Sequence, residues 1–173
     1  MESYEQRIFP VSMKTIPLVL ALLANCTTFG APKVSDPDPG RFSKAIANFQ
    51  VEDAATKVVG NLTLFTGSSS IRMWTSMRDD FPNHKTLNRG FGGSHISDVL
   101  HYFDLLVTPH KPKAIVLYCG ENDLWSGKPP KQVFDDFKAF AKRVHEKFPK
   151  TQQAAAAAPP SGRLPSTLTH VPL

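Results

Sequence analysis

The most informative stretch of the chain reads Phe65-Thr66-Gly67-Ser68-Ser69-Ser70-Ile71-Arg72-Met73-Trp74. It continues an apolar, strand-like run that begins at Leu62, and its later part has apolar residues spaced three apart, as on one face of a helix. The pattern predicts a strand, a tight turn and a helix, with Ser69 in the turn. A serine run on its own has a plainer interpretation as a helix N-cap, because serine is a preferred capping residue.

Two further polar loops come after strand-like segments. Gly90-Phe91-Gly92-Gly93 follows a predicted strand at 86–89, and Cys119-Gly120-Glu121-Asn122-Asp123 ends the continuous apolar run 114–119. Such an uninterrupted run is typical of a strand buried on both faces of a parallel sheet. Because ligand-binding loops gather at the carboxyl ends of parallel strands, we expect Ser69, Gly93 and Asn122 to lie close together.

Segments with helical periodicity separate the strands. Apolar residues recur at spacings of three and four in 96–106, and again in 133–148, a stripe that prolines open and end. A shorter amphipathic helix is expected at 42–49. The alternation predicts an α/β fold built of βαβ units, with a parallel sheet and right-handed crossovers.

The two ends of the chain differ in composition from its middle. Residues 31–41 alternate proline and aspartate and are expected to form a linker. After Lys150 come five consecutive alanines and then prolines, so residues 151–173 are expected to be a disordered, low-complexity tail. The predicted domain is 42–150, and its sheet is expected to be incomplete, with its last strands missing.

Residues 1–30 have the pattern of a leader. The basic segment Met13-Lys14-Thr15 precedes the apolar run 16–23, which is the form of a secretory signal and predicts a secreted or periplasmic protein. The apolar run is too short to span a bilayer. A buried helix is the alternative, although Pro17 interrupts the run.

The charge of the chain does not point to a nucleic acid partner. The net charge is +5 over 173 residues, but basic residues mix with acidic ones and form no stripe interleaved with aromatic residues. The cysteines do not suggest a disulfide framework, and Cys119, at the end of an apolar run, is expected to be a buried thiol. No metal cluster, Walker loop or dinucleotide fingerprint is present in the sequence, so we expect neither a cofactor nor a metal.

The three polar loops together hold the groups that acyl transfer needs. A serine hydroxyl becomes a competent nucleophile only beside a base, and the resulting oxyanion needs donors aimed at it. Ser69 is the candidate nucleophile, and its own N–H, the N–H of Gly93 and the side-chain amide of Asn122 are candidate donors. Each loop alone is usually only a cap or a turn, but the three in this order are more specific.

With these loops in this order, the chain resembles the SGNH hydrolases, the superfamily of GDSL-type esterases and lipases, and its secreted bacterial members in particular. Gly67-Ser68-Ser69 is similar to the first block, with Ser68 in place of the usual aspartate, and 87–93 and 118–123 are similar to the second and third blocks. The resemblance extends over 42–150. It implies an α/β fold with three α/β/α layers around a flavodoxin-like parallel sheet. It also implies hydrolysis of a small-molecule carboxylic ester, with Ser69 as nucleophile and Gly93 and Asn122 in the oxyanion hole.

The fourth block of this family, Asp-x-x-His, carries the base and its orienting acid, and no such motif follows Asn122 in this chain. His170 comes too soon after Asn122 and lacks an aspartate three residues before it. His95 lies just past the Gly93 turn and could approach the site, but as a helix-start residue it is expected to be solvated. His145 is expected to lie on the polar face of a helix. The chain is therefore expected to be truncated before this block, or frame-shifted after about residue 150, and impaired as an enzyme.

Two other interpretations stay open. The serine turn can bind an anion such as phosphate at a helix N-terminus without performing chemistry. Alternatively, an incomplete sheet would leave the strand 114–119 at an exposed apolar edge, which favours aggregation or association with a partner.

Overall fold

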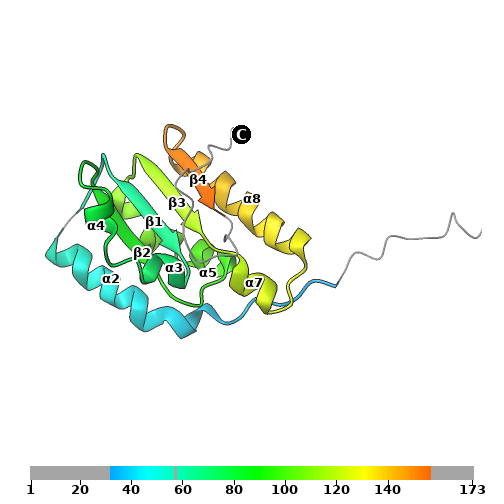
Figure 1. Cartoon of the computed structure of the whole chain (residues 1–173). Coiled ribbons are helices and arrows are strands. Elements are labelled where there is room, and N and C mark those ends of the chain that lie inside the picture. The colour runs from blue at the N-terminus through cyan, green and yellow to red at the C-terminus, as the bar shows by residue number, and fades with distance from the viewer. Residues whose placement is uncertain (1–31, 57, 157–173) are drawn as a thin grey trace, which may run out of the picture. The chain divides into compact units, whose positions relative to one another are not determined.

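The computed structural model describes residues 32–56 and 58–156. Its compact unit begins at Lys33. In this part of the chain, one sheet contains the parallel strands β1 (Thr63–Gly67), β2 (Thr86–Gly90), β3 (Ala114–Tyr118) and β4 (Gln152–Ala156). The strands lie in the order β2-β1-β3-β4 (Figure 1), as at the start of a flavodoxin-like sheet. The predicted parallel α/β fold is confirmed, whereas the predicted leader, 1–30, lies outside the described residues.

Helices and short 3-10 turns connect the strands. They are η1 (Pro39–Phe42), α2 (Ser43–Ala55), α3 (Ser69–Arg72), α4 (Met77–Asp80), α5 (Ile96–His101), α6 (Phe103–Leu106), η2 (Thr108–His110), α7 (Glu121–Trp125) and α8 (Pro130–Lys147). The helix α8 follows the predicted apolar stripe, while the predicted helix at 96–106 is divided into α5 and α6 at Tyr102. None of the helices in the described part of the chain combines the length and the apolar character needed to cross a bilayer.

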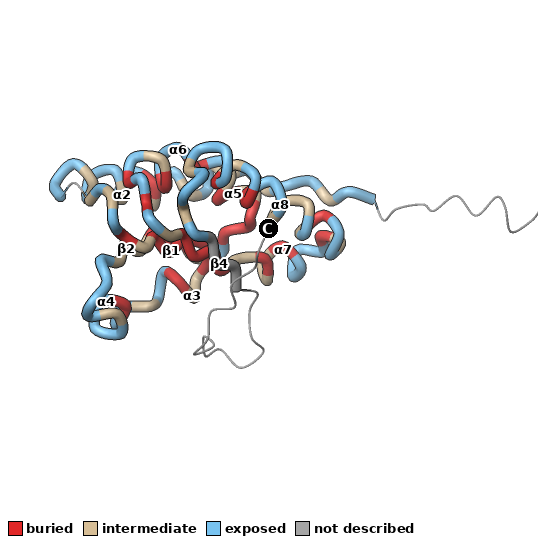
Figure 2. The backbone as a smooth tube through the Cα atoms, turned by 90° about the horizontal axis from the view of Figure 1, so that it is seen from above, coloured by how far each residue is buried: buried red, intermediate tan, exposed pale blue. Residues whose placement is uncertain are grey.

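The two faces of the sheet carry separate hydrophobic clusters, because successive residues of a strand point to opposite faces. Leu64, Ile115 and Leu117 pack on one face with residues of α2, α5, α6 and α8. Phe65 and Val116 pack on the other face with residues of α3 and α4. Figure 2 shows the same division, with α2, α5, α6 and α8 on one side of the strands and α3 and α4 on the other. The three-layer arrangement is confirmed, and full burial of a side chain such as Leu64 stabilises it by about 1.5–3 kcal/mol.

The segment after Ser69 differs from the single helix that its spacing predicts. It forms two short helices, α3 and α4, with Trp74 between them. Trp74 packs edge-on against Phe65, at 5.6 Å between ring centroids, and its Nε1 donates to Asp80. The Ser76 hydroxyl also donates to Asp80, at 2.7 Å. These local side-chain bonds hold a turn where a helix would have continued.

The prediction that no strand follows residue 150 is wrong. β4 pairs in parallel with β3, in a register that sets Gln152 beside Ala114. The hydroxyl of Thr151 fixes the approach by donating to the carbonyl of Pro112 at 2.7 Å. The backbone N–H and C=O groups at the edge of β3 need hydrogen-bond partners, and β4 provides them. A run of alanines has no alternation of apolar and polar residues, so the sequence does not predict this strand. The domain boundary at 150 and the bare edge predicted for β3 are wrong for the same reason, while 157–173 lie outside the described residues.

Candidate active site

Ser69 lies at the junction of β1 and α3, where it is the first residue of the helix and is half-buried. The junction depends on Gly67, whose φ of +129° is a conformation that favours glycine. A Cβ at this position would lie 2.0 Å from the carbonyl oxygen of Tyr118, so β1 and β3 approach too closely for a side chain. The N–H of Ser68 donates to the same oxygen at 3.0 Å. This close approach sets Ser69 at the carboxyl end of β1.

Ser68 ties this turn to the loop that carries Asn122. It is buried, and its Oγ donates to Glu121 Oε1 at 2.8 Å and does not cap α3. Glu121 is the first residue of α7 and directly precedes Asn122. Its other oxygen, Oε2, is buried with no hydrogen-bond partner in the described residues. A hydroxyl at position 68 donates to this carboxylate, whereas an aspartate there would repel it, so the departure from the family pattern is matched by Glu121.

The loop after β2 is tied to the same place. Asn122 Nδ2 donates to the carbonyl of Ser94 at 3.1 Å, and the thiol of Cys119 donates to that carbonyl at 3.2 Å. Gly93 directly precedes Ser94, is exposed and has a φ of +86°. The second N–H of the Asn122 amide has no acceptor among the described residues, which leaves it free to donate to a ligand.

A backbone hydrogen bond joins the remaining pair of loops. The N–H of Phe91 donates to the carbonyl of Gly67 at 2.9 Å. The parallel register also aligns the carboxyl ends of β1, β2 and β3. Each of the three loops is therefore bonded to the other two, and the predicted convergence of the loops that carry Ser69, Gly93 and Asn122 is observed. The catalytic roles of these residues stay predictions.

His95 is buried and not solvated, so the prediction for this residue is wrong. It is the N-cap residue of α5, and its N–H donates to Asp98 Oδ2 at 2.8 Å. Its Nδ1 lies 3.7 Å from Oδ1 of the buried Asp123 and has no hydrogen-bond partner among the described residues. The start of a helix is usually exposed, but here Asp123 of α7 packs against it. The local sequence pattern does not predict such a tertiary contact. His145 is exposed, as predicted, and His170 lies outside the described residues.

A buried lysine anchors the segments behind the loops, and no sequence motif marks it. Lys128 Nζ pairs with Asp36, with Asp123 at 2.9 Å and with Asp136 at 3.1 Å, and it donates to Ser97 Oγ at 3.3 Å. Burial opposes the charge, but hydrogen bonds to these three carboxylates hold the pKa of Lys128 above its usual range. Below pH 10.5, which is the ordinary pKa of lysine, Lys128 makes its full contribution to stability. This contribution is lost only as the pH rises through the higher pKa that Lys128 has in the folded protein.

Cys119 is half-buried, less than its place at the end of an apolar run predicts. Burial, together with the carboxylate of Asp123, raises the pKa of the thiol. It therefore stays protonated near neutral pH and is not a nucleophile. Within residues 32–56 and 58–156, no three His, Cys, Asp or Glu side chains are grouped so that they could hold a metal ion.

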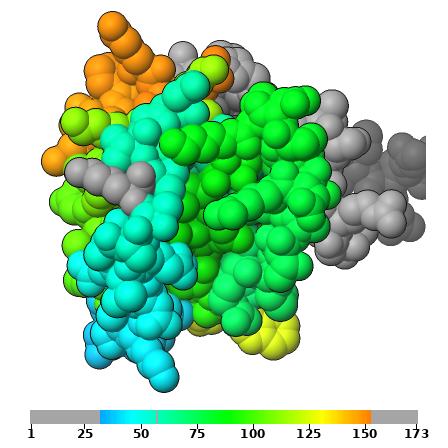
Figure 3. All heavy atoms as spheres, turned by 90° about the vertical axis from the view of Figure 1, so that its left-hand side faces the viewer, coloured from blue at the N-terminus to red at the C-terminus, as the bar shows by residue number. Residues whose placement is uncertain are grey.

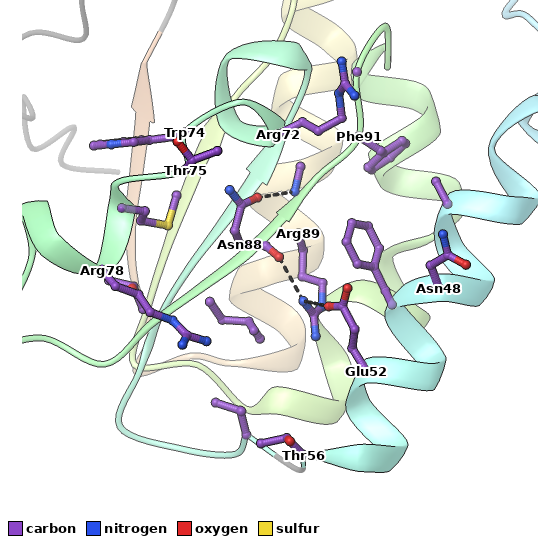
Figure 4. A pocket seen from close by; sticks show the side chains of 18 of the residues that line it. Asn48, Glu52, Thr56, Arg72, Trp74, Thr75, Arg78, Asn88, Arg89 and Phe91 are labelled. Carbon is purple, nitrogen blue, oxygen red and sulfur yellow. Dashed lines mark hydrogen bonds and ion pairs between the residues drawn. The ribbon is translucent and has the colours of Figure 1, made fainter.

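A groove of about 1120 Å³ runs along β2 beside these loops. One wall is α2, the other comes from the segment 72–78, and the floor is formed by 86–92; we call it the β2 groove. Figure 3 shows it as a hollow between α2, in cyan, and the green segment that faces it. At one end lie Arg72, Phe91 and Gly92, and Gly92 directly precedes Gly93, so the groove adjoins the candidate site (Figure 4).

Comparison with known protein families gave a match over most of the described domain. Residues 60–171 match the model of the GDSL-like lipase/acylhydrolase family, and the match extends past residue 150, the predicted limit of the resemblance. A search of curated proteins found no match.

Solved structures share the fold. A Streptococcus pneumonia protein described as a platelet activating factor is 19% identical, with a TM-score of 0.60 over 80% of this chain and 59% of that one. A GDSL-like lipase from Bacteroides thetaiotaomicron is 19% identical, with a TM-score of 0.56 over 64% of this chain and 56% of that one. A Bacteroides fragilis protein described as an acylhydrolase is 15% identical, with a TM-score of 0.53 over 70% and 58%.

The chain thus spans less than two thirds of the length of each of these structures. At such identities the likeness shows the fold alone. The family model, by contrast, matches more than half of the chain. The chain therefore belongs to the GDSL-like lipase/acylhydrolase family, within the SGNH superfamily.

Proposed function

We propose that this chain is an SGNH-type serine hydrolase of small-molecule carboxylic esters. Ser69 Oγ attacks the ester carbonyl while a base takes its proton, and the N–H groups of Ser69 and Gly93 and the amide of Asn122 hold the oxyanion. The intermediate collapses as the alcohol leaves with that proton, and water then releases the acid. The observation that carries the proposal is the hydrogen-bonded junction of the three loops, because these loops contain the hydroxyl and the three donors that the proposal needs.

The proton of Ser69 needs an acceptor, and the chain offers none of the expected kind. In its 173 residues no Asp-x-x-His follows Asn122. His95 is buried beside Asp123, and His145 is exposed on α8. We therefore expect slow turnover from these 173 residues, because loss of the base costs on the order of 10⁶ in turnover in a serine hydrolase. The remaining rate acceleration then comes from substrate binding and from the oxyanion donors.

The alternative, an anion held at the serine turn without chemistry, has fewer donors than the sequence pattern predicts. The N–H and hydroxyl of Ser68 are already bonded to Tyr118 and Glu121. The helix α3 has only 4 residues. A turn this short, with donors that are already bonded, offers little to hold an anion by itself, so the geometry favours the esterase proposal.

Hydrolysis of 4-nitrophenyl acetate is expected to be slow and to depend more on Asn122 than on Ser69. Asn122→Ala removes one oxyanion donor and is expected to lower the protein-dependent rate by on the order of 10²-fold. Ser69→Ala is expected to change that rate little, because a serine without a base adds little to turnover. Asn83→Ala, at an exposed asparagine outside the site, is the control.

The release of 4-nitrophenolate, corrected for the rate without protein, gives these rates. Turnover comparable to that of a complete esterase, and abolished in Ser69→Ala, would show that a residue of this chain supplies the base after all. An unchanged rate in Asn122→Ala would remove this amide from the oxyanion hole.

A further inference from the structure

The β2 groove contains arginines without a carboxylate partner. In the described part of the chain, Arg41, Arg89 and Arg143 each form an ion pair. Arg72 and Arg78 form none with the described residues, and both line the β2 groove. An exposed arginine usually has no need of a partner, but two in one groove give it a net positive field that attracts anions.

The side chain of Arg72 lies at the end of the groove nearest the candidate site. Arg72 ends α3, three residues after Ser69. Its guanidinium packs over Gly92, because a Cβ on Gly92 would lie 2.7 Å from Arg72 Nε and 3.2 Å from Cζ. Gly92 directly precedes Gly93, so the guanidinium lies beside the loop that carries a candidate oxyanion donor. Figure 4 shows Arg72 and Phe91 together at this end, with Arg78 farther along the groove.

The rest of the lining offsets only part of this positive charge. Glu52 is the acidic residue of the lining, and its carboxylate accepts a hydrogen bond from Arg89 at 3.2 Å. Arg89 is buried and also pairs with Asp53, so its single charge is shared between two carboxylates, and the net positive charge of the lining comes from Arg72 and Arg78. The aromatic side chains of Phe49 and Phe91 add apolar surface. The groove therefore offers apolar contact along its length and a cationic group at the end near Ser69.

The edge of β2 is not available to an added strand. The N–H of Gly90 donates to Oδ1 of Asn88 at 2.9 Å, and the carbonyl of Asn88 accepts from Arg89 Nη1 at 2.9 Å. Backbone groups that an extended peptide would need are thus already bonded within the chain. These contacts favour a small ligand over an extended peptide as the occupant.

We propose that the β2 groove binds an anionic group, a carboxylate or a phosphate, carried by the ester substrate, and that Arg72 is the residue that selects it. A guanidinium presents paired donors that match the two oxygens of either group. The inference rests on the proposed ester hydrolase function, and it narrows the substrates to esters that carry a negative charge a few bonds from the carbonyl carbon.

Binding can be tested without turnover by isothermal titration calorimetry. The probes are monomethyl adipate, butyl phosphate and the neutral dimethyl adipate. Both anions are expected to bind the wild-type protein more tightly than the neutral diester, and Arg72→Gln is expected to weaken them by about 10- to 100-fold. Arg72→Lys is expected to restore part of the affinity, because it keeps the charge and loses the fork of donors. The anion that binds more tightly shows whether the groove prefers a carboxylate or a phosphate.

Two controls separate this proposal from its alternatives. Arg143→Gln removes the same charge from a surface arginine that pairs with Asp104, and it is expected to leave the affinity unchanged. Ser69→Ala is expected to bind the anions as well as the wild type does, so failure of the nucleophile would not affect this result. The subsite is refuted if the anions bind no more tightly than the diester, or if Arg72→Gln and Arg143→Gln weaken them equally.

Discussion

The Lys128→Met variant is expected to lose about 3–5 kcal/mol of the free energy of unfolding. The side chains of Lys128 and Asp123 are both 0% exposed, so removal of the cation leaves a buried carboxylate without its counter-charge. Asp36, before η1, and Asp136, on α8, lose the same anchor. Asp123 directly follows Asn122, and we therefore expect the loop with the proposed oxyanion donor to become less ordered as well.

Urea unfolding followed by circular dichroism measures this loss. Lys131→Met is the matched control, because the side chain of Lys131 is 84% exposed and pairs with Asp135 on the surface. A surface pair of this kind is expected to contribute less than about 1 kcal/mol. Equal losses in the two variants would show that the buried cluster around Lys128 does not hold the fold together.

The Gly67→Ala variant is expected to lose at least about 3 kcal/mol, since it combines left-handed backbone strain with overpacking. The added methyl group would meet the carbonyl oxygen of Tyr118 at 2.0 Å, a backbone atom that moves only if β3 moves. The N–H of Ser68 bonds to the same oxygen. Relief of the clash therefore shifts the turn that positions Ser69.

Gly127→Ala separates the strain from the clash. Gly127 also has a positive φ, +88°, but a Cβ there meets no atom within 4 Å. The Gly127→Ala variant is expected to lose only about 1–2 kcal/mol of the free energy of unfolding, from backbone strain alone. Thermal melting of both variants provides the comparison. A Gly67→Ala loss no larger than that of Gly127→Ala would mean that β1 and β3 do not approach as closely at Tyr118.

The fold was predictable wherever side-chain pattern and burial agree. Residues 115–118 of the apolar run are buried in the sheet, and Phe140 and Val144 of the α8 stripe are buried against it. The sequence pattern of both elements predicts this burial. β4 was not predictable, because its pairing with β3 uses backbone groups and its alanines carry no period. The division of the helix after Ser69 depends on side-chain bonds to Asp80, which spacing does not reveal.

The loops of the candidate site could be predicted from the sequence, but the hydrogen bonds and ion pairs that position these loops could not. Glycine and polar residues at strand ends indicate where loops meet, so the meeting of the loops with Ser69, Gly93 and Asn122 could be predicted. The bond from Ser68 to Glu121 joins residues 53 positions apart, and nothing local marks it. The burial of Lys128 depends in the same way on carboxylates from three separate segments.

Butylboronic acid tests most directly whether Ser69 is a nucleophile held beside oxyanion donors. Boron accepts Ser69 Oγ as a fourth ligand while the hydroxyl proton passes to solvent, so the adduct needs no histidine. The anionic boronate places an oxygen where the oxyanion would form, and the donors stabilise it. Boron NMR at mildly alkaline pH is expected to show tetrahedral boron with the wild-type protein, less of it with Asn122→Ala and none with Ser69→Ala. Tetrahedral boron that persists in Ser69→Ala, or its absence with the folded wild-type protein, would contradict the proposed site.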